Sequence, residues 1–383
     1  MVIAAPSLWC ELVAGLTEQG VLDLSWRSAF LEVPRDVFIP EVIWHYAGDE
    51  LVPLRRADDP AEWLARAYGP GYVVTQVDDG APAGSHGRGR VATSSASRPD
   101  IVAMMLTAGQ VKPGMRVLEI GTGTGYTAAL LAHRLGARNV TSIEIDPQLA
   151  ARARSTLKRA GYGEVTVITG DGAEGYPVGA PFDRVLSTVA ASHVPYAWVA
   201  QTRPGGLVVT PWSSAYKPAG LLCLTVRPDA TATGGLVNTT ISFMPLRNQR
   251  IHRAAIADVV RETDTPTLMR TEVHACRVCN DSDACFAIAL QVLGCYWEYQ
   301  AASSDPGRWW VWFLDPGTRS WARFDGQPGT RSWLVHQFGP RRLWDEITAA
   351  YHRWIGAGRP PATRWRFTVT PSGQRVELPS ARG

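Results

Sequence analysis

The stretch VLEIGTGTG, residues 117–125, decides the fold. An apolar run ends in an acid, and glycines then follow at every second position, which predicts a strand that turns tightly into a helix. On both sides of it, short apolar runs alternate with amphipathic stretches. We expect helices over 126–135 and 147–160, and strands over 116–120, 140–145, 165–169, 184–189, 207–211, 221–226 and 239–243. This alternation predicts an α/β fold with a doubly wound, mainly parallel sheet covered on both faces.

Length and composition restrict the class of protein. With 383 residues, 45% hydrophobic and 19% charged, the chain suits two globular domains. A net charge of +3 is too small to indicate nucleic-acid binding. The N-terminus lacks the basic start of a signal peptide, and no uncharged apolar stretch is long enough to cross a membrane. Six cysteines in so long a chain do not suggest a secreted disulfide scaffold. The sequence predicts a cytoplasmic protein.

The composition of the sequence changes near residue 250. Nine of the 15 tryptophans lie beyond it. Residues 309–325 and 364–378 each resemble a hairpin with a turn of proline and glycine, and 341–355 has the periodicity of an amphipathic helix. We therefore divide the chain into a catalytic α/β domain over 1–250, with a helical N-terminal segment, and an accessory α+β domain over 251–383.

The spacing of the glycines and the position of Glu119 select the class of cofactor. In a dinucleotide fingerprint the third glycine falls three residues after the second, but that position here is Tyr126. Glu119 ends the first strand, beside the turn where a pyrophosphate would lie, and its carboxylate would repel a phosphate. S-adenosylmethionine (SAM) has no phosphate and carries an ammonium and a sulfonium. The pattern therefore favours SAM.

Two further acids end the next two strands. Glu144 closes the second strand, where a carboxylate can accept hydrogen bonds from both ribose hydroxyls. Asp171 closes the third strand in a GDG turn and suits the adenine amino group. Glycines after a strand can simply make a turn, but an acid at the end of three successive strands is a far more specific pattern.

Here the sequence resembles a known family, the protein-L-isoaspartate O-methyltransferases, over residues 26–246. The resemblance is carried by FLEVPRDVFIP (30–40), SSASRPDIVAMML (94–106), VLEIGTGTGYTAALLA (117–132), SIEID (142–146), GDGAEGYPVGAPFDRV (170–185), RPGGLVV (203–209) and FMPLR (243–247). It implies a doubly wound sheet with an added antiparallel strand. It also implies SAM as methyl donor and S-adenosylhomocysteine as product.

The resemblance further implies which residues form the site. Ser97 falls on the serine that the family uses as its active residue, with Ser95 and Arg98 as further catalytic candidates. The implied cofactor-binding residues are Ser94, Ser95, Ser97, Glu119, Gly121, Thr122, Gly123, Glu144, Ile145, Asp171 and Gly172. The implied acceptor-binding residues are Gln76, Asp78, Asp79, Arg98 and His193. The serines are equally suited to cap the helix that begins at Pro99.

Departures from the family's pattern favour peptide tailoring over general repair. Arg98 stands where the family has glutamine, residues 72–80 replace the loop that approaches the isoaspartyl residue, and 251–383 have no counterpart in the repair enzyme. Residues 339–376 resemble the tail of a subgroup that accompanies the biosynthesis of ribosomal peptides: graspetides, lanthipeptides and lasso peptides. The resemblance implies a pre-modified, macrocyclised precursor peptide as partner. An Asp side chain of that peptide is methylated, and the ester then closes to an aspartimide.

Alternatives remain at this stage. The protein could repair isoaspartyl residues, or serve as a SAM-binding partner without activity. His274, Cys276, Cys279 and Cys285 include one C-x-x-C pair but no second pair at matching distance, so we expect no metal. The tryptophans and arginines of the tail could stack bases, but its nearly balanced charge favours core packing, and we expect no nucleic acid.

Overall fold

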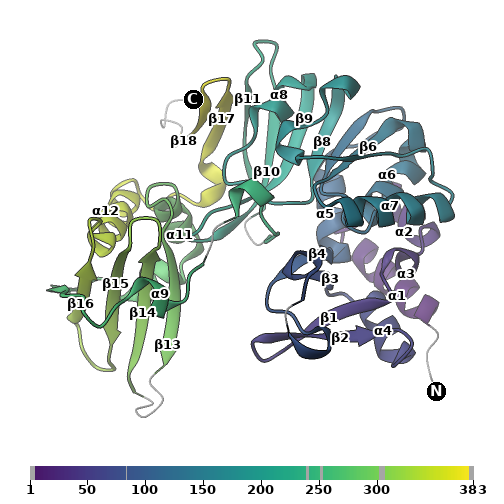
Figure 1. Ribbon diagram of the computed structural model, residues 1–383. Coiled ribbons are helices and arrows are strands. Elements are labelled where there is room, and N and C mark those ends of the chain that lie inside the picture. Colours follow the sequence, from purple (N-terminus) through teal and green to yellow (C-terminus); the bar gives the residue numbers. More distant parts are fainter. Residues whose placement is uncertain (1–4, 83, 239–240, 251–252, 302–306, 379–383) are drawn as a thin grey trace.

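The computed structural model describes residues 5–82, 84–238, 241–250, 253–301 and 307–378, and its largest sheet has nine strands in the order β18-β17-β11-β10-β9-β8-β5-β6-β7 (Figure 1). Strands β5 to β9 run parallel, and the other pairings are antiparallel. The strands are β5 (Val117–Ile120), β6 (Val140–Glu144), β7 (Thr166–Thr169), β8 (Phe182–Ser187), β9 (Thr202–Ser213), β10 (Pro218–Val226), β11 (Ala232–Asn238), β17 (Arg366–Thr370) and β18 (Gly373–Glu377). The predicted doubly wound α/β fold is confirmed.

Helices cover both faces of this sheet because its buried strands are apolar on both sides. Val117 packs into the core that contains α6, whereas its neighbour Leu118 packs into the core that contains α8. The helices of this half are α1 (Ala5–Glu18), α2 (Leu24–Glu32), α3 (Arg35–Phe38), α4 (Pro60–Ala67), α5 (Pro99–Ala108), α6 (Tyr126–Leu135), α7 (Pro147–Arg159) and α8 (Tyr196–Ala200). The helices predicted over 126–135 and 147–160 are thus confirmed.

A small antiparallel sheet lies beside the main one, and the sequence analysis did not predict it. Its order is β2-β1-β3-β4. The strands are β1 (Val42–Ala47), β2 (Glu50–Arg55), β3 (Val73–Val77) and β4 (Ala92–Ala96). Trp63 of α4 is fully buried against this sheet. Strand β4 leads directly into α5, so the serines of residues 94–97 lie where the small sheet meets the catalytic sheet.

The accessory region is a five-stranded sheet, β12-β16-β15-β14-β13, with α10, α11 and α12 on one face and the short α9 on the other. Its elements are α9 (Ile256–Val259), β12 (Thr267–Thr271), α10 (Ala275–Cys279), α11 (Ser282–Ala289), β13 (Tyr296–Ala301), β14 (Trp309–Asp315), β15 (Ser320–Gly326), β16 (Trp333–Phe338) and α12 (Leu343–Gly356). The predicted hairpin over 309–325 and the helix over 341–355 correspond to β14–β15 and α12. Most of the tryptophans are core residues or lie at the edge of the core, as the sequence favoured.

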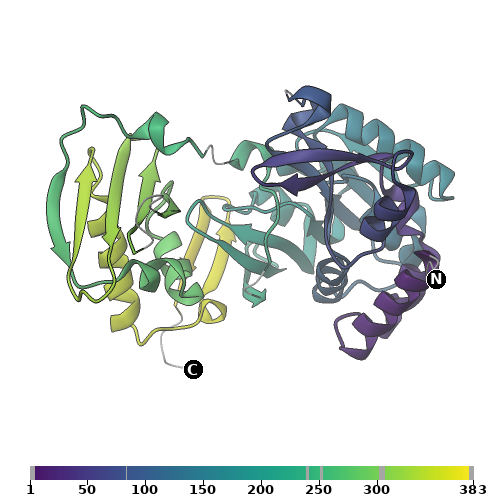
Figure 2. The same cartoon turned by 90° about the horizontal axis from the view of Figure 1, so that it is seen from below.

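Two details differ from the sequence-based division. The hairpin predicted over 364–378 exists as β17–β18, but it pairs with β11 and so extends the catalytic sheet (Figure 2). Trp212 of β9 stacks edge-on against Phe286 of α11 at 5.3 Å, so both regions share one apolar core.

The strand predicted over 239–243 is wrong: β11 ends at Asn238, residues 241–243 are not a strand, and 239–240 lie outside the described residues.

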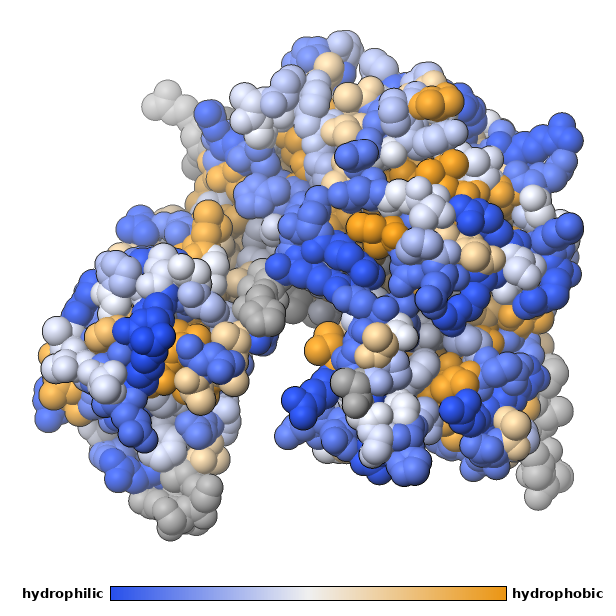
Figure 3. All heavy atoms as spheres, in the orientation of Figure 1, coloured by the Kyte–Doolittle hydropathy of each residue, from blue (hydrophilic) through white to orange (hydrophobic). Residues whose placement is uncertain are grey.

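The space-filling view shows an open cleft between the accessory region and the lobe that contains β1–β4 (Figure 3). The hairpin of β1 and β2 points toward the accessory region (Figure 1). None of the described helices combines the length and the apolar character that a membrane span requires.

Candidate active site

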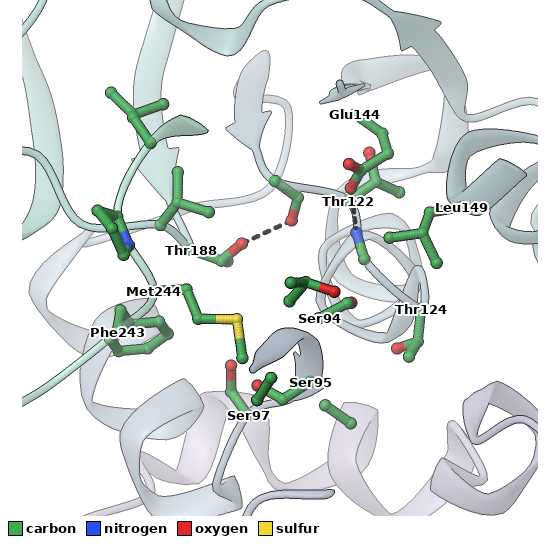
Figure 4. Close-up of a pocket in the computed structure, with 18 of the residues that line it drawn as sticks. Ser94, Ser95, Ser97, Thr122, Thr124, Glu144, Leu149, Thr188, Phe243 and Met244 are labelled. Atoms are coloured by element: carbon green, nitrogen blue, oxygen red, sulfur yellow. Dashed lines mark hydrogen bonds between the residues drawn. The ribbon is translucent and has the colours of Figure 1, made fainter. Parts of the chain in front are cut away.

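A cavity of about 590 Å³ lies where β5 and β6 end, between the glycine loop and the junction of β4 with α5 (Figure 4). Ligands of doubly wound sheets bind beyond the carboxyl ends of the strands, and this cavity follows that rule. Residues 242–247 and Arg250, which lead into the accessory region, form a further wall. The predicted site residues that line it are Ser94, Ser95, Ser97, Arg98, Gly121, Thr122, Gly123, Glu144, Ile145, Asp171 and Gly172.

Gly121 occupies a position that excludes any side chain. Its φ is +89°, and a Cβ would lie 2.8 Å from Thr188 Oγ1 and 3.0 Å from Val189 Cγ1. The Thr188 hydroxyl donates to the Gly121 carbonyl at 2.6 Å, which fixes the loop against the end of β8. Because α6 begins directly after Gly125, main-chain N–H groups without helical partners lie beside the loop. A ligand can therefore approach the main chain closely here.

Glu144 projects into the cavity from the end of β6 (Figure 4). Its carboxylate accepts hydrogen bonds from the Gly123 N–H at 2.8 Å and the Asp146 N–H at 3.0 Å. Burial raises the pKa of Glu144, and these two N–H groups oppose the rise. Each carboxylate oxygen keeps a further lone pair, so the group can accept from two ligand hydroxyls at once.

Glu119 lies behind the cavity wall, not in it. It is fully buried, accepts from the Ser142 hydroxyl at 2.5 Å, and has no partner for Oε1 among the described residues. Ser142 Oγ in turn lies 2.6 Å from Thr122 Oγ1, which links the acid to the glycine loop. Burial raises the pKa of Glu119 to about 8. The sequence placed this acid at the cofactor, whereas the structure connects it to the cavity through two hydroxyl groups.

Asp171 and Gly172 form the end of the cofactor wall after β7. The Asp171 carboxylate accepts from the Ala173 N–H at 2.9 Å and from the Asn248 amide at 3.4 Å. A Cβ at Gly172 would lie 2.5 Å from Ile120 Cγ2, so only glycine fits against β5. The acid is half-buried, and its position agrees with a role as acceptor for an adenine amino group.

The residues on this side of the cavity fit SAM. Glu144 suits ribose hydroxyls. The unpartnered Glu119 oxygen and the raised pKa mark a carboxylate that a nearby cation would stabilise. SAM carries that positive charge and no phosphate, so the donor set of the structure matches the cofactor.

The serines of β4 and of the residue that follows it face the cofactor wall from the opposite side (Figure 4). Ser95 and Ser97 are half-buried cavity residues, and neither hydroxyl bonds to another described residue. Ser94 is buried and accepts from the Thr75 hydroxyl at 3.2 Å. The α5 helix has no side-chain cap, so the alternative that these serines serve as an N-cap is wrong. Two hydroxyl donors are thus free to bind an acceptor.

A buried arginine fixes the segment that carries Ser97. Arg35 is fully buried, and its guanidinium donates to the carbonyl oxygens of Ser97 at 2.9 Å and Ala67 at 2.5 Å. Burial lowers the pKa of Arg35 to about 10. Arg35 belongs to the VPR motif that carried the family resemblance, so the structure gives this motif a physical role beside the site.

Four predicted acceptor-binding residues do not line the cavity. Gln76 is buried and donates to Asp146 Oδ2 at 2.8 Å. The Asp78 carboxylate accepts main-chain N–H groups, and Asp79 is ion-paired with arginines at 2.9 and 3.2 Å. His193 is exposed beside Ser192. The sequence could not show these internal partners, which join segments far apart in the chain.

Arg98 lines the cavity but is already paired. Its guanidinium donates to both oxygens of Asp100, at 3.1 and 2.6 Å. The sequence missed several other cavity residues: Tyr46, Tyr72, Arg90, Met244, Arg247 and Arg250. In the sequence, FMPLR (243–247) was noted only as the end of the catalytic domain. Its position directly after the last strand of that domain was the signal that could have placed it at the cavity.

The cysteine-rich segment has a structural explanation. His274 Nδ1 accepts from the Cys276 N–H at 3.1 Å and caps α10, and its ring packs edge-on against Trp333 at 4.7 Å. Cys279 and Cys285 are buried in the core. The part of the chain that the structure describes contains no cluster of three or more His, Cys, Asp or Glu side chains that could hold a metal ion.

Comparisons with known proteins show which family the chain resembles. The family model for protein-L-isoaspartate(D-aspartate) O-methyltransferase matches residues 87–250. The protein-L-isoaspartate O-methyltransferase of Ignicoccus hospitalis is 36% identical over 203 residues, which cover 52% of this chain and 80% of that protein. The Pyrococcus horikoshii enzyme of the same name is 32% identical over 244 residues, covering 62% and 92%.

The fold of the whole chain also has a solved counterpart. A structure described as a protein-L-isoaspartate O-methyltransferase aligns with 97% of this chain and 100% of its own, at 19% identity and a TM-score of 0.56. The alignment extends into the accessory region, so the expectation that the repair enzyme has no counterpart of residues 251–383 is wrong for this structure. The chain belongs to the protein-L-isoaspartate O-methyltransferase family of SAM-dependent carboxyl O-methyltransferases.

Proposed function

We propose that the protein methylates an Asp side-chain carboxylate in a macrocyclised ribosomal peptide, and that the ester then closes to an aspartimide. The observation that supports methylation of a carboxylate is the pair of serine hydroxyls, Ser95 and Ser97, that face the cofactor wall without a described protein partner. The resemblance of residues 339–376 to peptide-tailoring enzymes supports this choice of acceptor.

The site needs to position the acceptor rather than to deprotonate it. A carboxylate is already ionised at neutral pH and is its own nucleophile. SAM, when bound, supplies a methyl group activated by the sulfonium. Glu144 and Asp171 hold the cofactor side, and Ser97 donates a hydrogen bond to the carboxylate oxygen that does not react. Arg35 fixes the main chain of Ser97, so that this hydroxyl keeps its place.

The second step needs no further group of the enzyme. The neighbouring amide nitrogen of the peptide attacks the ester carbonyl, forming the ring C–N bond as the C–O bond to methoxide breaks. The amide proton leaves with the methoxide as methanol. The products are an aspartimide and methanol, which balances atoms and charge.

Repair of isoaspartyl residues is the second candidate. Two observations favour it: the relatives named above are protein-L-isoaspartate O-methyltransferases, and the solved structure that aligns with the whole chain has the same description. The two candidates share the ester chemistry and differ in the acceptor alone.

Intact-mass measurement with two acceptors separates the candidates. The purified protein is incubated with SAM and either a linear isoaspartyl peptide or a macrocyclised ribosomal peptide that contains aspartate. Tailoring predicts a methyl gain and then a methanol loss on the macrocycle, with the linear peptide unchanged. A methyl gain on the isoaspartyl peptide alone would establish repair. If SAM is not consumed with either acceptor, the result would support a SAM-binding partner without activity. Gly121→Ala serves as the protein without a working cofactor site.

A further inference from the structure

Exposed apolar side chains gather at the mouth of the cavity. Tyr46, Tyr72 and Val91 are 53%, 54% and 60% exposed, and all three line the same cavity as the serines. They come from β1, from the residue before β3, and from the residue before β4. Large apolar side chains that converge from separate segments at one opening are typical of a recognition surface.

Arg90 stands beside them as a cation without a partner. Among the described residues, the arginines that line the cavity are Arg90, Arg98, Arg247 and Arg250. Arg98 is paired with Asp100, and both Arg247 and Arg250 are paired with Asp79, at 3.2 and 2.9 Å. The guanidinium of Arg90 makes no hydrogen bond or ion pair to another described residue. Its charge is therefore available to a ligand.

The main chain that carries Arg90 is held rigidly. The Asp78 carboxylate accepts the N–H of Arg90 at 3.1 Å and the N–H of Val91 at 2.9 Å. Gly89 exchanges two main-chain hydrogen bonds with Leu51, at 2.8 and 2.9 Å, and a Cβ on Gly89 would lie 2.5 Å from a methyl group of Val77. Such a fixed base reduces the entropy lost when the side chain binds a ligand.

We propose that Arg90, with Tyr46 and Tyr72, forms a docking site for a second carboxylate of the acceptor peptide, next to an apolar or aromatic side chain. This proposal rests on the proposed function only in that the acceptor is a peptide. The reacting carboxylate belongs at the serines, because a guanidinium bound to it would withdraw the charge that makes it a nucleophile. Arg90 instead recognises a residue that flanks the modified one, and so determines sequence specificity.

Binding of a labelled peptide tests the docking site without turnover. The probes are a short fluorescein-labelled peptide with several aspartates and one phenylalanine, and the same peptide with asparagines in place of the aspartates. Anisotropy is measured with the full-length protein saturated with S-adenosylhomocysteine. The acidic peptide is expected to bind about fivefold tighter than its neutral counterpart, the range for a partly exposed ion pair. Arg90→Gln reduces this preference to less than about twofold.

Arg88→Gln is the matched control. Arg88 lies two positions away in the same exposed segment, but it is ion-paired with Glu50 at 2.7 Å and does not line the cavity. It should leave the preference unchanged, whereas Tyr46→Ala with Tyr72→Ala weakens both peptides alike. The proposal is overturned if wild type binds both peptides equally or not at all, or if Arg88→Gln acts like Arg90→Gln. Because no methyl transfer is measured, failure of the tailoring proposal leaves this result interpretable.

Discussion

The two walls of the cavity satisfy their polar groups in different ways. On the cofactor wall, Glu144 accepts two main-chain N–H groups, and Thr188 donates to the glycine loop. On the acceptor wall, the hydroxyls of Ser95 and Ser97 and the guanidinium of Arg90 have no described partner. Apart from Glu119 Oε1 behind it, the cofactor wall thus has its acids and loop held by the chain itself, whereas the free hydroxyls and guanidinium of the acceptor wall are left for what it binds.

This contrast explains which features the sequence revealed. A wall made of glycines and strand-terminal acids has a fixed local spacing, so residues 117–125 were enough to locate it. A wall made of free side chains has no such spacing. Whether an arginine or an amide side chain stays free depends on whether it finds a partner in a distant part of the chain, and the local sequence does not show this. Substitutions on the cofactor wall should therefore change cofactor affinity, and those on the acceptor wall should change acceptor binding or turnover and leave cofactor affinity unchanged.

Gly121→Ala is expected to have the largest effect. A Cβ would lie 2.8 Å from Thr188 Oγ1, and alanine at a φ of +89° adds about 1–3 kcal/mol of strain. We expect the affinity for S-adenosylhomocysteine, measured by titration calorimetry, to fall about 100-fold, since about 2.7 kcal/mol of loop distortion corresponds to that factor. Gly114→Ala is the control, because its φ is +81° but no atom lies within 4 Å. Equal losses of cofactor affinity in the two variants would mean that backbone strain alone, and not the contact with Thr188, causes the effect.

Glu144→Gln is expected to follow. The change removes a charged acceptor of the Gly123 N–H and of the ribose hydroxyls, and hydrogen bonds to charged groups contribute about 2 kcal/mol. Cofactor affinity should therefore fall about 30-fold, again by calorimetry. Glu164→Gln, an exposed carboxylate paired with Arg138 away from the cavity, should leave affinity unchanged. Unchanged affinity in Glu144→Gln would remove this acid from the cofactor wall.

Ser97→Ala tests the other wall. We expect kcat to fall about tenfold through the loss of one hydrogen bond to the acceptor, with cofactor affinity unchanged. The measurement pairs steady-state methylation with calorimetry on the same protein. A parallel loss of cofactor affinity would show that the serine belongs to the cofactor wall, and the contrast between the walls would then be wrong.

The limits of prediction have the same physical origin. The glycine loop, Glu144 and Asp171 were predictable because parallel strands end at one edge of the sheet. Gln76 was expected at the acceptor, yet its amide binds Asp146, a residue 70 positions away. The hairpin of β17 and β18 was predicted correctly. No local pattern could show that it pairs with β11, because the accessory region separates the two in the sequence. Elements follow from local periodicity, whereas their partners follow from long-range packing.

Glu119→Gln is expected to change stability to an extent that depends on pH. Burial raises the folded pKa of Glu119 to about 8, from a usual value of 4.5. Between these values the native state keeps a proton that the unfolded state has lost, so wild type loses stability as pH rises through this interval and no further above it. Glutamine has no such proton, so its melting temperature relative to wild type should rise from pH 5 to pH 8.

Saturation with SAM sharpens this last test. A bound cation near Glu119 would favour its carboxylate form and lower the pKa, so the advantage of glutamine at pH 8 should shrink when SAM is present. If the difference in melting temperature is the same at both pH values, Glu119 is ionised in the folded protein throughout. If it depends on pH but not on SAM, the acid supports the glycine loop through Ser142 and Thr122 and does not sense the charge of the cofactor.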